Sequence, residues 1–97
     1  MLAMIKSFRG RISEAIAEGR RPKGFPPDLI GRAQNKLAMI EAAVRIDDLR
    51  APPGNRLEAL KGERKGAWSI RINDQWRVCF YWRDGGAEEV EVVDYHT

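Results

Sequence analysis

Two short runs near the middle of the chain alternate strictly between apolar and polar side chains. They cover residues 68–73 and 76–81. Alternation with a period of two is typical of strands that bury one face. A two-residue loop between them would mix apolar and polar positions on each face. A three-residue loop, 73–75, instead pairs Ile70 with Val78 and keeps every apolar residue on one face, so the sequence predicts a hairpin in that register.

The same register sets Arg71 directly opposite Arg77 on the other face of the hairpin. Like charges in this relation destabilise a sheet by about 0.2–1 kcal/mol. An anion between them would compensate, and guanidinium groups suit phosphate because their fork of donors binds it bidentately. The alternative is that both arginines are solvated and splayed apart on an exposed face. The register therefore predicts a phosphate site and leaves the solvated alternative open.

The length of 97 residues allows one domain with its own core, and we expect a single domain over residues 1–97. Met4 is an alternative start, which would make residues 1–3 an extra leader. No apolar run approaches the roughly 18 residues of a membrane span, and no signal peptide is recognisable. One cysteine and one histidine are too few for a Cys/His zinc site. We therefore expect a cytoplasmic protein without metal, cofactor or membrane contact.

The basic residues are unevenly distributed along the chain. Residues 50–83 contain eight basic and three acidic residues, whereas residues 84–97 contain five acidic and no basic ones. The basic block is the candidate surface for a polyanion. The acidic block either partly neutralises it or forms the polar face of a last strand.

The remaining elements follow from periodicity and from glycine and proline. We expect a strand at 5–8, a short helix at 13–18, a short strand within 55–60 and a last strand at 89–94. A longer helix is predicted by apolar residues at spacings of three and four, namely Ile30, Ala33, Leu37, Ile40 and Val44. The order β-α-α-β-β-β-β predicts an α+β fold, with two N-terminal helices against a mostly antiparallel twisted sheet.

The residues that could perform chemistry are cations, a tyrosine, a histidine and a few carboxylates. No glycine-rich phosphate loop or nucleophile elbow is present, and Cys79 is best interpreted as a structural thiol. This set suits RNA cleavage without metal, because RNA supplies its own nucleophile, the 2′-hydroxyl. The protein must remove the hydroxyl proton, stabilise charge on the phosphate and protonate the 5′-oxygen. Cations and histidine can perform these tasks.

Three motifs follow one another in the second half of the chain. They are LxxLKGxRxGxWSI from residue 57, NxQWRVxF from residue 73 and VDYH from residue 93. In this order they resemble the HigB family of bacterial toxins, within the RelE/ParE superfamily, and the similarity runs from about residue 5 to the end. The resemblance implies a compact RelE-like microbial RNase fold. It also implies a ribosome-dependent endoribonuclease that cuts mRNA in the A site and inhibits translation, partnered by a HigA-like helix-turn-helix antitoxin.

Site residues follow from the resemblance position by position. Lys61 and Arg77 match family positions that stabilise the scissile phosphate. Asp94, Tyr95 and His96 match the terminal active-site cluster, with His96 or Tyr95 as the proton-transfer group. The resemblance therefore predicts a site that joins the middle of the chain to its last residues.

Four further cations complete the predicted RNA surface. Arg71 joins the phosphate site through the register argument, while Arg56, Arg64 and Lys65 are expected to hold ribosomal RNA. One position departs from the family, since many relatives have a histidine where this chain has Glu58. Its carboxylate could act as a general base, leave the enzyme slower, or simply be exposed.

Two other classes of function remain open. One is a non-catalytic poison of the ParE type, which acts on DNA gyrase and lacks the lysine, arginine, tyrosine and histidine set. The other is a basic nucleic-acid-binding module, for which base-stacking aromatic residues on the exposed face would be expected. Tyr81 is the only strand aromatic that the register places there, so the module ranks lowest.

Overall fold

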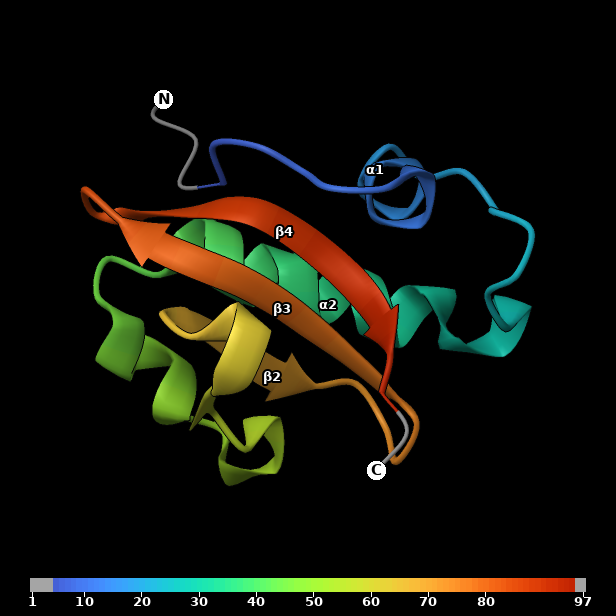
Figure 1. The fold of residues 1–97 in the computed structure, drawn as a ribbon. Coiled ribbons are helices and arrows are strands. Elements are labelled where there is room, and N and C mark those ends of the chain that lie inside the picture. Colours follow the sequence, from blue (N-terminus) through green and yellow to red (C-terminus); the bar gives the residue numbers. More distant parts are fainter. Residues whose placement is uncertain (1–4, 96–97) are drawn as a thin grey trace.

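The computed structural model describes residues 5–95, in which two helices pack against a four-stranded antiparallel sheet (Figure 1). The helices are α1 (Arg11–Ala17) and α2 (Ile30–Ala42). The strands, which lie in sequence order across the sheet, are β1 (Glu58–Ala59), β2 (Ala67–Arg71), β3 (Trp76–Arg83) and β4 (Gly86–Asp94). This arrangement confirms the predicted α+β class. None of the described helices is long and apolar enough to cross a membrane.

The hairpin formed by β2 and β3 has the predicted register. Ile70 lies opposite Val78, and the Ile72 N–H donates a hydrogen bond to the Trp76 carbonyl at 2.9 Å, so the loop is residues 73–75. The Asn73 side chain closes this loop, because its Oδ1 accepts hydrogen bonds from the backbone N–H groups of Gln75 and Trp76, at 2.9 and 2.7 Å. A side chain that bonds to backbone two and three residues ahead favours a tight turn. The loop length therefore fixes which side chains share a face.

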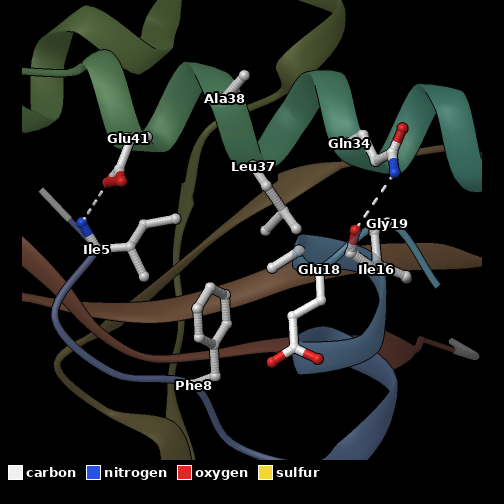
Figure 2. Close-up of a pocket in the computed structure, with 10 residues that line it drawn as sticks. Ile5, Phe8, Ile16, Glu18, Gly19, Gln34, Leu37, Ala38 and Glu41 are labelled. Carbon is white, nitrogen blue, oxygen red and sulfur yellow. Dashed lines mark hydrogen bonds between the residues drawn. The ribbon is translucent and has the colours of Figure 1, made fainter. Parts of the chain in front are cut away.

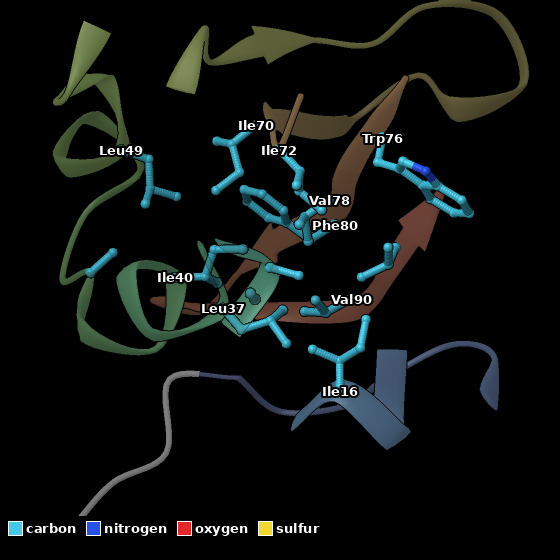
Figure 3. Close-up of a cluster of buried hydrophobic side chains, with 14 of the residues drawn as sticks. Ile16, Leu37, Ile40, Leu49, Ile70, Ile72, Trp76, Val78, Phe80 and Val90 are labelled. Atoms are coloured by element: carbon cyan, nitrogen blue, oxygen red, sulfur yellow. The ribbon is translucent and has the colours of Figure 1, made fainter. Parts of the chain in front are cut away.

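The apolar face of the hairpin packs against α2 and forms the core (Figure 3). Phe80, Val78 and Ile70 are almost completely buried, and they meet Leu37 and Ile40 from the helix. We call this side of the sheet the inner face and the opposite side the outer face. Because side chains alternate along a strand, the residues between these core positions are directed to the outer face.

The end of α2 differs from the prediction at Val44, which is 68% exposed instead of buried. The helix stops at Ala42, and Ala43 has an extended backbone with φ −70° and ψ 132°. The carboxylate of Asp48 then accepts hydrogen bonds from the N–H groups of Val44 and Arg45, at 2.9 and 3.0 Å. A new 3₁₀ turn, η2 (Ile46–Arg50), begins there. The helix and its apolar stripe therefore end before Val44, the last residue of the predicted stripe.

The predicted strand at 5–8 is not a regular strand in the structure. It pairs with β4 through two isolated parallel bridges, Ile5 with Ala87 and Phe8 with Val90. A bulge in β4 lies between these contacts, where Glu89 has a positive φ of 53°. A bulge interrupts the ladder of hydrogen bonds, so continuous pairing is not formed there.

Helix α1 lies beside β4 (Figure 1). One buried serine, Ser13, makes a hydrogen bond to that strand. The Ser13 hydroxyl accepts a hydrogen bond from the backbone N–H of Val92 at 2.7 Å and donates one to the carbonyl of Arg9 at 3.1 Å. Ser13 is only 1% exposed. Because buried polar groups are costly to leave unpaired, these two hydrogen bonds fix the helix relative to the sheet.

Candidate functional site

The outer face of the sheet carries a polar depression of about 280 Å³. We call it the arginine depression. It is lined by Arg56, Glu58, Arg71, Asn73, Asp74, Arg77 and Tyr95. The lining comes from the residue before Leu57 and from β1, from β2 and β3 with their connecting loop, and from the residue after β4. The structure therefore brings together five of the residues that the sequence predicted to contact RNA or to act in catalysis.

Arg77 is the most firmly held of these residues. Its Nη1 donates a hydrogen bond to Ser69 Oγ at 2.7 Å and lies 3.8 Å from a carboxylate oxygen of Glu58. The guanidinium also lies over the Tyr95 ring, 5.5 Å from its centroid. Its side chain is only 15% exposed. A cation fixed in this way can meet a developing negative charge without reorganising first.

Arg71 lies directly opposite Arg77, as the register predicted. The pair is neither splayed into solvent nor uncompensated, because each arginine has a carboxylate partner. Arg71 pairs with Asp74, and Arg77 lies near Glu58. Three arginines and two carboxylates line the depression, so it keeps an excess of positive charge.

The pKa values of two nearby groups are shifted by burial and by neighbouring charges. The pKa of the Lys36 ammonium is lowered, first by burial and then by the positive charges of Arg32 and Arg71. The pKa of the Cys79 thiol is raised by burial, although the charge of Arg64 opposes the shift. A buried thiol with a raised pKa is a poor nucleophile, which agrees with the structural role predicted for Cys79.

Arg56 reaches the depression from a left-handed backbone conformation, with φ 46° and ψ 55°. It follows the 3₁₀ turn η3 (Pro53–Asn55), and its carbonyl lies 3.5 Å from Nη1 of Arg77. Residues other than glycine adopt this conformation at a cost of roughly 1 kcal/mol or more. Asn55 holds the turn in place and is completely buried.

We expect Arg56→Gly and Arg56→Ala to differ in stability but not in activity. Both remove the cation, whereas only glycine relieves the left-handed backbone. The glycine variant should therefore be about 0.5–1 kcal/mol more stable than the alanine variant in urea unfolding. Both should lose RNA affinity to the same extent. Equal stabilities would contradict the backbone assigned to Arg56.

The other predicted residues lie outside the lining of this depression. Lys61 and Lys65 are exposed on the connection around η4 (Gly62–Arg64). Arg64 pairs with Glu91 at 3.4 Å. Asp94 is exposed, and its carboxylate accepts a hydrogen bond from the Gln75 side chain at 3.2 Å. His96 lies outside the described residues.

Three residues at the site were missed by reasoning from the sequence. Asn73 and Asp74 belong to the hairpin loop, and Ser69 positions Arg77. The signal for Ser69 was present in the alternation, which puts it on the same face as Arg71 and Arg77. Its small neutral side chain gave no reason to assign it a role.

A second depression, of about 450 Å³, is mainly apolar and lies between the N-terminal segment and the two helices (Figure 2). Phe8, Ile16 and Leu37 point into it. The polar groups at its rim are already used, since Glu41 accepts a hydrogen bond from the Ile5 N–H at 2.7 Å and Gln34 donates one to the Ile16 carbonyl at 3.3 Å. No cation is among the described residues of its lining, so these residues do not suit a phosphate substrate.

The chain matches a family model over residues 6–96, described as the RelE-like toxin of the type II toxin–antitoxin system HigB. The fold and the length of this match define a RelE-like toxin of a type II pair. Within that class, the chain belongs to the HigB-like toxin family. An antitoxin is therefore its partner.

Curated relatives agree with this assignment. Toxin HigB-1 of Vibrio cholerae serotype O1 is 43% identical over 85 residues, which cover 87% of this chain and 90% of the relative. Endoribonuclease HigB of Proteus vulgaris is 33% identical over 93 residues, which cover 96% of this chain and all of the relative. The similarity therefore spans nearly whole proteins on both sides.

Proposed function

We propose that this toxin is an endoribonuclease that cleaves mRNA in the A site of the ribosome and so inhibits translation. The observation that carries the proposal is the convergence of Arg56, Arg71 and Arg77 with Tyr95 around one depression. The name of the Proteus vulgaris relative, endoribonuclease HigB, supports the same activity. Action on ribosomes would take place in the cytoplasm.

The chemistry requires only groups that this chain and its substrate supply. The 2′-oxygen forms a bond to the adjacent phosphorus and loses its proton to a base, while the bond from phosphorus to the 5′-oxygen breaks. Arg77 and Arg71 stabilise the charge that develops on the phosphate. His96 or Tyr95 transfers the proton to the leaving oxygen, and Lys61 adds positive charge from its exposed connection.

Glu58 is our choice for the group that receives the 2′-hydroxyl proton. Its carboxylate lies 3.8 Å from Nη1 of Arg77, inside the same depression. A carboxylate placed beside the phosphate-binding cation is within reach of the adjacent ribose.

The small number of aromatic rings in the depression supports the proposed dependence on the ribosome. Among the described lining residues, Tyr95 is the only aromatic ring on which a base could stack. Proteins that bind single-stranded RNA by themselves generally offer several such rings. The ribosome would supply the missing constraint by holding the mRNA, while the cations Arg64 and Lys65 contact ribosomal RNA. The proposed protein partner of this toxin is a HigA-like helix-turn-helix antitoxin.

The experiment is cleavage of a defined mRNA, mapped by primer extension with and without programmed ribosomes. Wild type is compared with His96→Gln. We expect cuts only when ribosomes are present, and a loss of about 100-fold or more in the variant, the usual contribution of general acid–base catalysis. If the protein makes no cuts but still stops growth, it is a non-catalytic poison of the ParE type, and gyrase becomes the target to test.

A further inference from the structure

A second basic surface lies on α1 and the loop that follows it. Four cations surround a depression of about 570 Å³, which has Ile12 and Ala15 in its lining. We call it the α1 basic surface. Its cations are Arg11, Arg20, Arg21 and Lys23. None of them belongs to the basic block 50–83 or to the motifs shared with the family, so the proposed function leaves this surface without a role.

Most of the charge on this surface is available for a ligand. Arg20 pairs with Glu18 at 2.7 Å. Arg11, Arg21 and Lys23 are exposed and have no carboxylate partner within the described part of the chain. The segment 9–23 contains five basic and two acidic residues, an excess as large as the net charge of +3 of the whole protein. Such a concentration of one sign on one surface is typical of polyanion binding.

The α1 basic surface is separate from the arginine depression. Helix α1 lies beside β4 (Figure 1). The arginine depression is instead built mainly from β1, β2, β3 and the segment before β1. The Ser13 hydrogen bonds hold α1 against β4, away from the arginine depression. One ligand site can therefore be occupied without disturbing the other.

We infer that the α1 basic surface binds the phosphate backbone of ribosomal RNA while the arginine depression holds the mRNA. The inference rests on the proposed function and adds a docking site to it. Three of the four cations are arginines, whose planar donors bind phosphate bidentately. Phosphates on a folded RNA are closely spaced, so several guanidinium groups can be engaged at once. An exposed, strongly basic depression on α1 and the loop after it fits such a ridge of phosphates.

The test compares binding to purified ribosomes for wild type and the double variant Arg21→Ala/Lys23→Ala over a range of salt concentrations. We expect the affinity of the variant to fall about tenfold at low salt. The slope of log affinity against log salt should become shallower by about two, one for each lost phosphate contact. Cleavage at saturating ribosome concentration should be unchanged, because the arginine depression is intact.

Two control variants make the test specific. Lys6→Ala/Arg45→Ala removes the same charge from exposed positions outside both the α1 basic surface and the basic block 50–83, and should keep the wild-type slope. Arg21→Lys/Lys23→Arg keeps the charge on the α1 basic surface and should keep most of the affinity. If all three variants have the wild-type slope, the inference is wrong.

The alternative occupant is an acidic polypeptide, for which poly-glutamate serves as the probe. If Arg21→Ala/Lys23→Ala loses binding to poly-glutamate but binds ribosomes normally, the surface belongs to a protein partner and the inference is overturned. Binding is measured independently of cleavage. A wild-type protein that binds ribosomes through this surface but cuts nothing would therefore refute the proposed function and leave the docking site standing.

Discussion

Arg77→Ala is expected to lower mRNA cleavage on programmed ribosomes by about 100- to 1,000-fold, the effect of removing one preorganised group that stabilises transition-state charge. The reason is geometric. The guanidinium is held between Ser69 Oγ at 2.7 Å and Glu58 at 3.8 Å, and it is mostly shielded from water. Arg77→Lys should recover only part of the activity, because lysine keeps the charge and loses the planar fork. Primer extension measures the mRNA cleavage by wild type, Arg77→Ala and Arg77→Lys.

Arg83→Ala is the matched control. Arg83 lies on the same strand, β3, but it pairs with Glu88 at 2.8 Å and stacks on Tyr81, outside the arginine depression. We expect near wild-type cleavage from this variant. Circular dichroism should give the same fold for both alanine variants. Full activity in Arg77→Ala would remove the arginine depression from the proposed mechanism.

The second large effect is expected on stability, from Asn55→Ala. Asn55 is completely buried; its Nδ2 donates to the carbonyls of Leu49 and Ala51 at 3.1 and 3.3 Å, and its Oδ1 accepts from Lys36 at 2.5 Å. Alanine would leave these groups without their partner. Each unsatisfied buried group costs about 1–3 kcal/mol, so we expect a loss of about 2–4 kcal/mol in the free energy of unfolding.

Urea unfolding measures this loss, with Asn35→Ala as the control. Asn35 is an exposed asparagine on α2, so its replacement should change stability by less than about 0.5 kcal/mol. Because Asn55 fixes the turn that carries Arg56, Asn55→Ala should also weaken RNA binding below its unfolding transition. A stability equal to that of Asn35→Ala would show that the turn does not depend on the buried amide.

The hairpin and the centre of the site could be predicted because both depend on local rules. Alternation fixes which face a side chain occupies, and the loop length fixes the register. Together they predicted that Arg71 lies opposite Arg77, and the structure confirms this. The contribution of the chain terminus came from the family resemblance alone, since no local rule connects Tyr95 to β3. In the structure, the Tyr95 N–H donates to the Gln75 carbonyl at 2.6 Å.

The features that escaped prediction depend on contacts between distant residues or on unusual backbone conformations. The left-handed conformation of Arg56 has no sequence signal, because arginine is not favoured there. Helical periodicity continued through Val44, but capping by Asp48 ended the helix first. The irregular pairing of residues 5–8 depends on a bulge at Glu89, near the other end of the chain. Periodicity predicts where helices and strands lie, but it does not predict where a helix ends early or where a strand has a bulge.

The N-terminal segment has a consequence for how copies of this protein behave toward one another. An edge strand with unpaired backbone groups can recruit a strand from another molecule. Residues 5–9 cover the free side of β4, with hydrogen bonds from Lys6 N–H to Ala87, from Val90 N–H to Ser7 and from Arg9 N–H to Val90. At the opposite edge, β1 is only two residues long. Within the described chain both edges are therefore short or covered, which disfavours aggregation by sheet extension despite the long apolar strands in the centre.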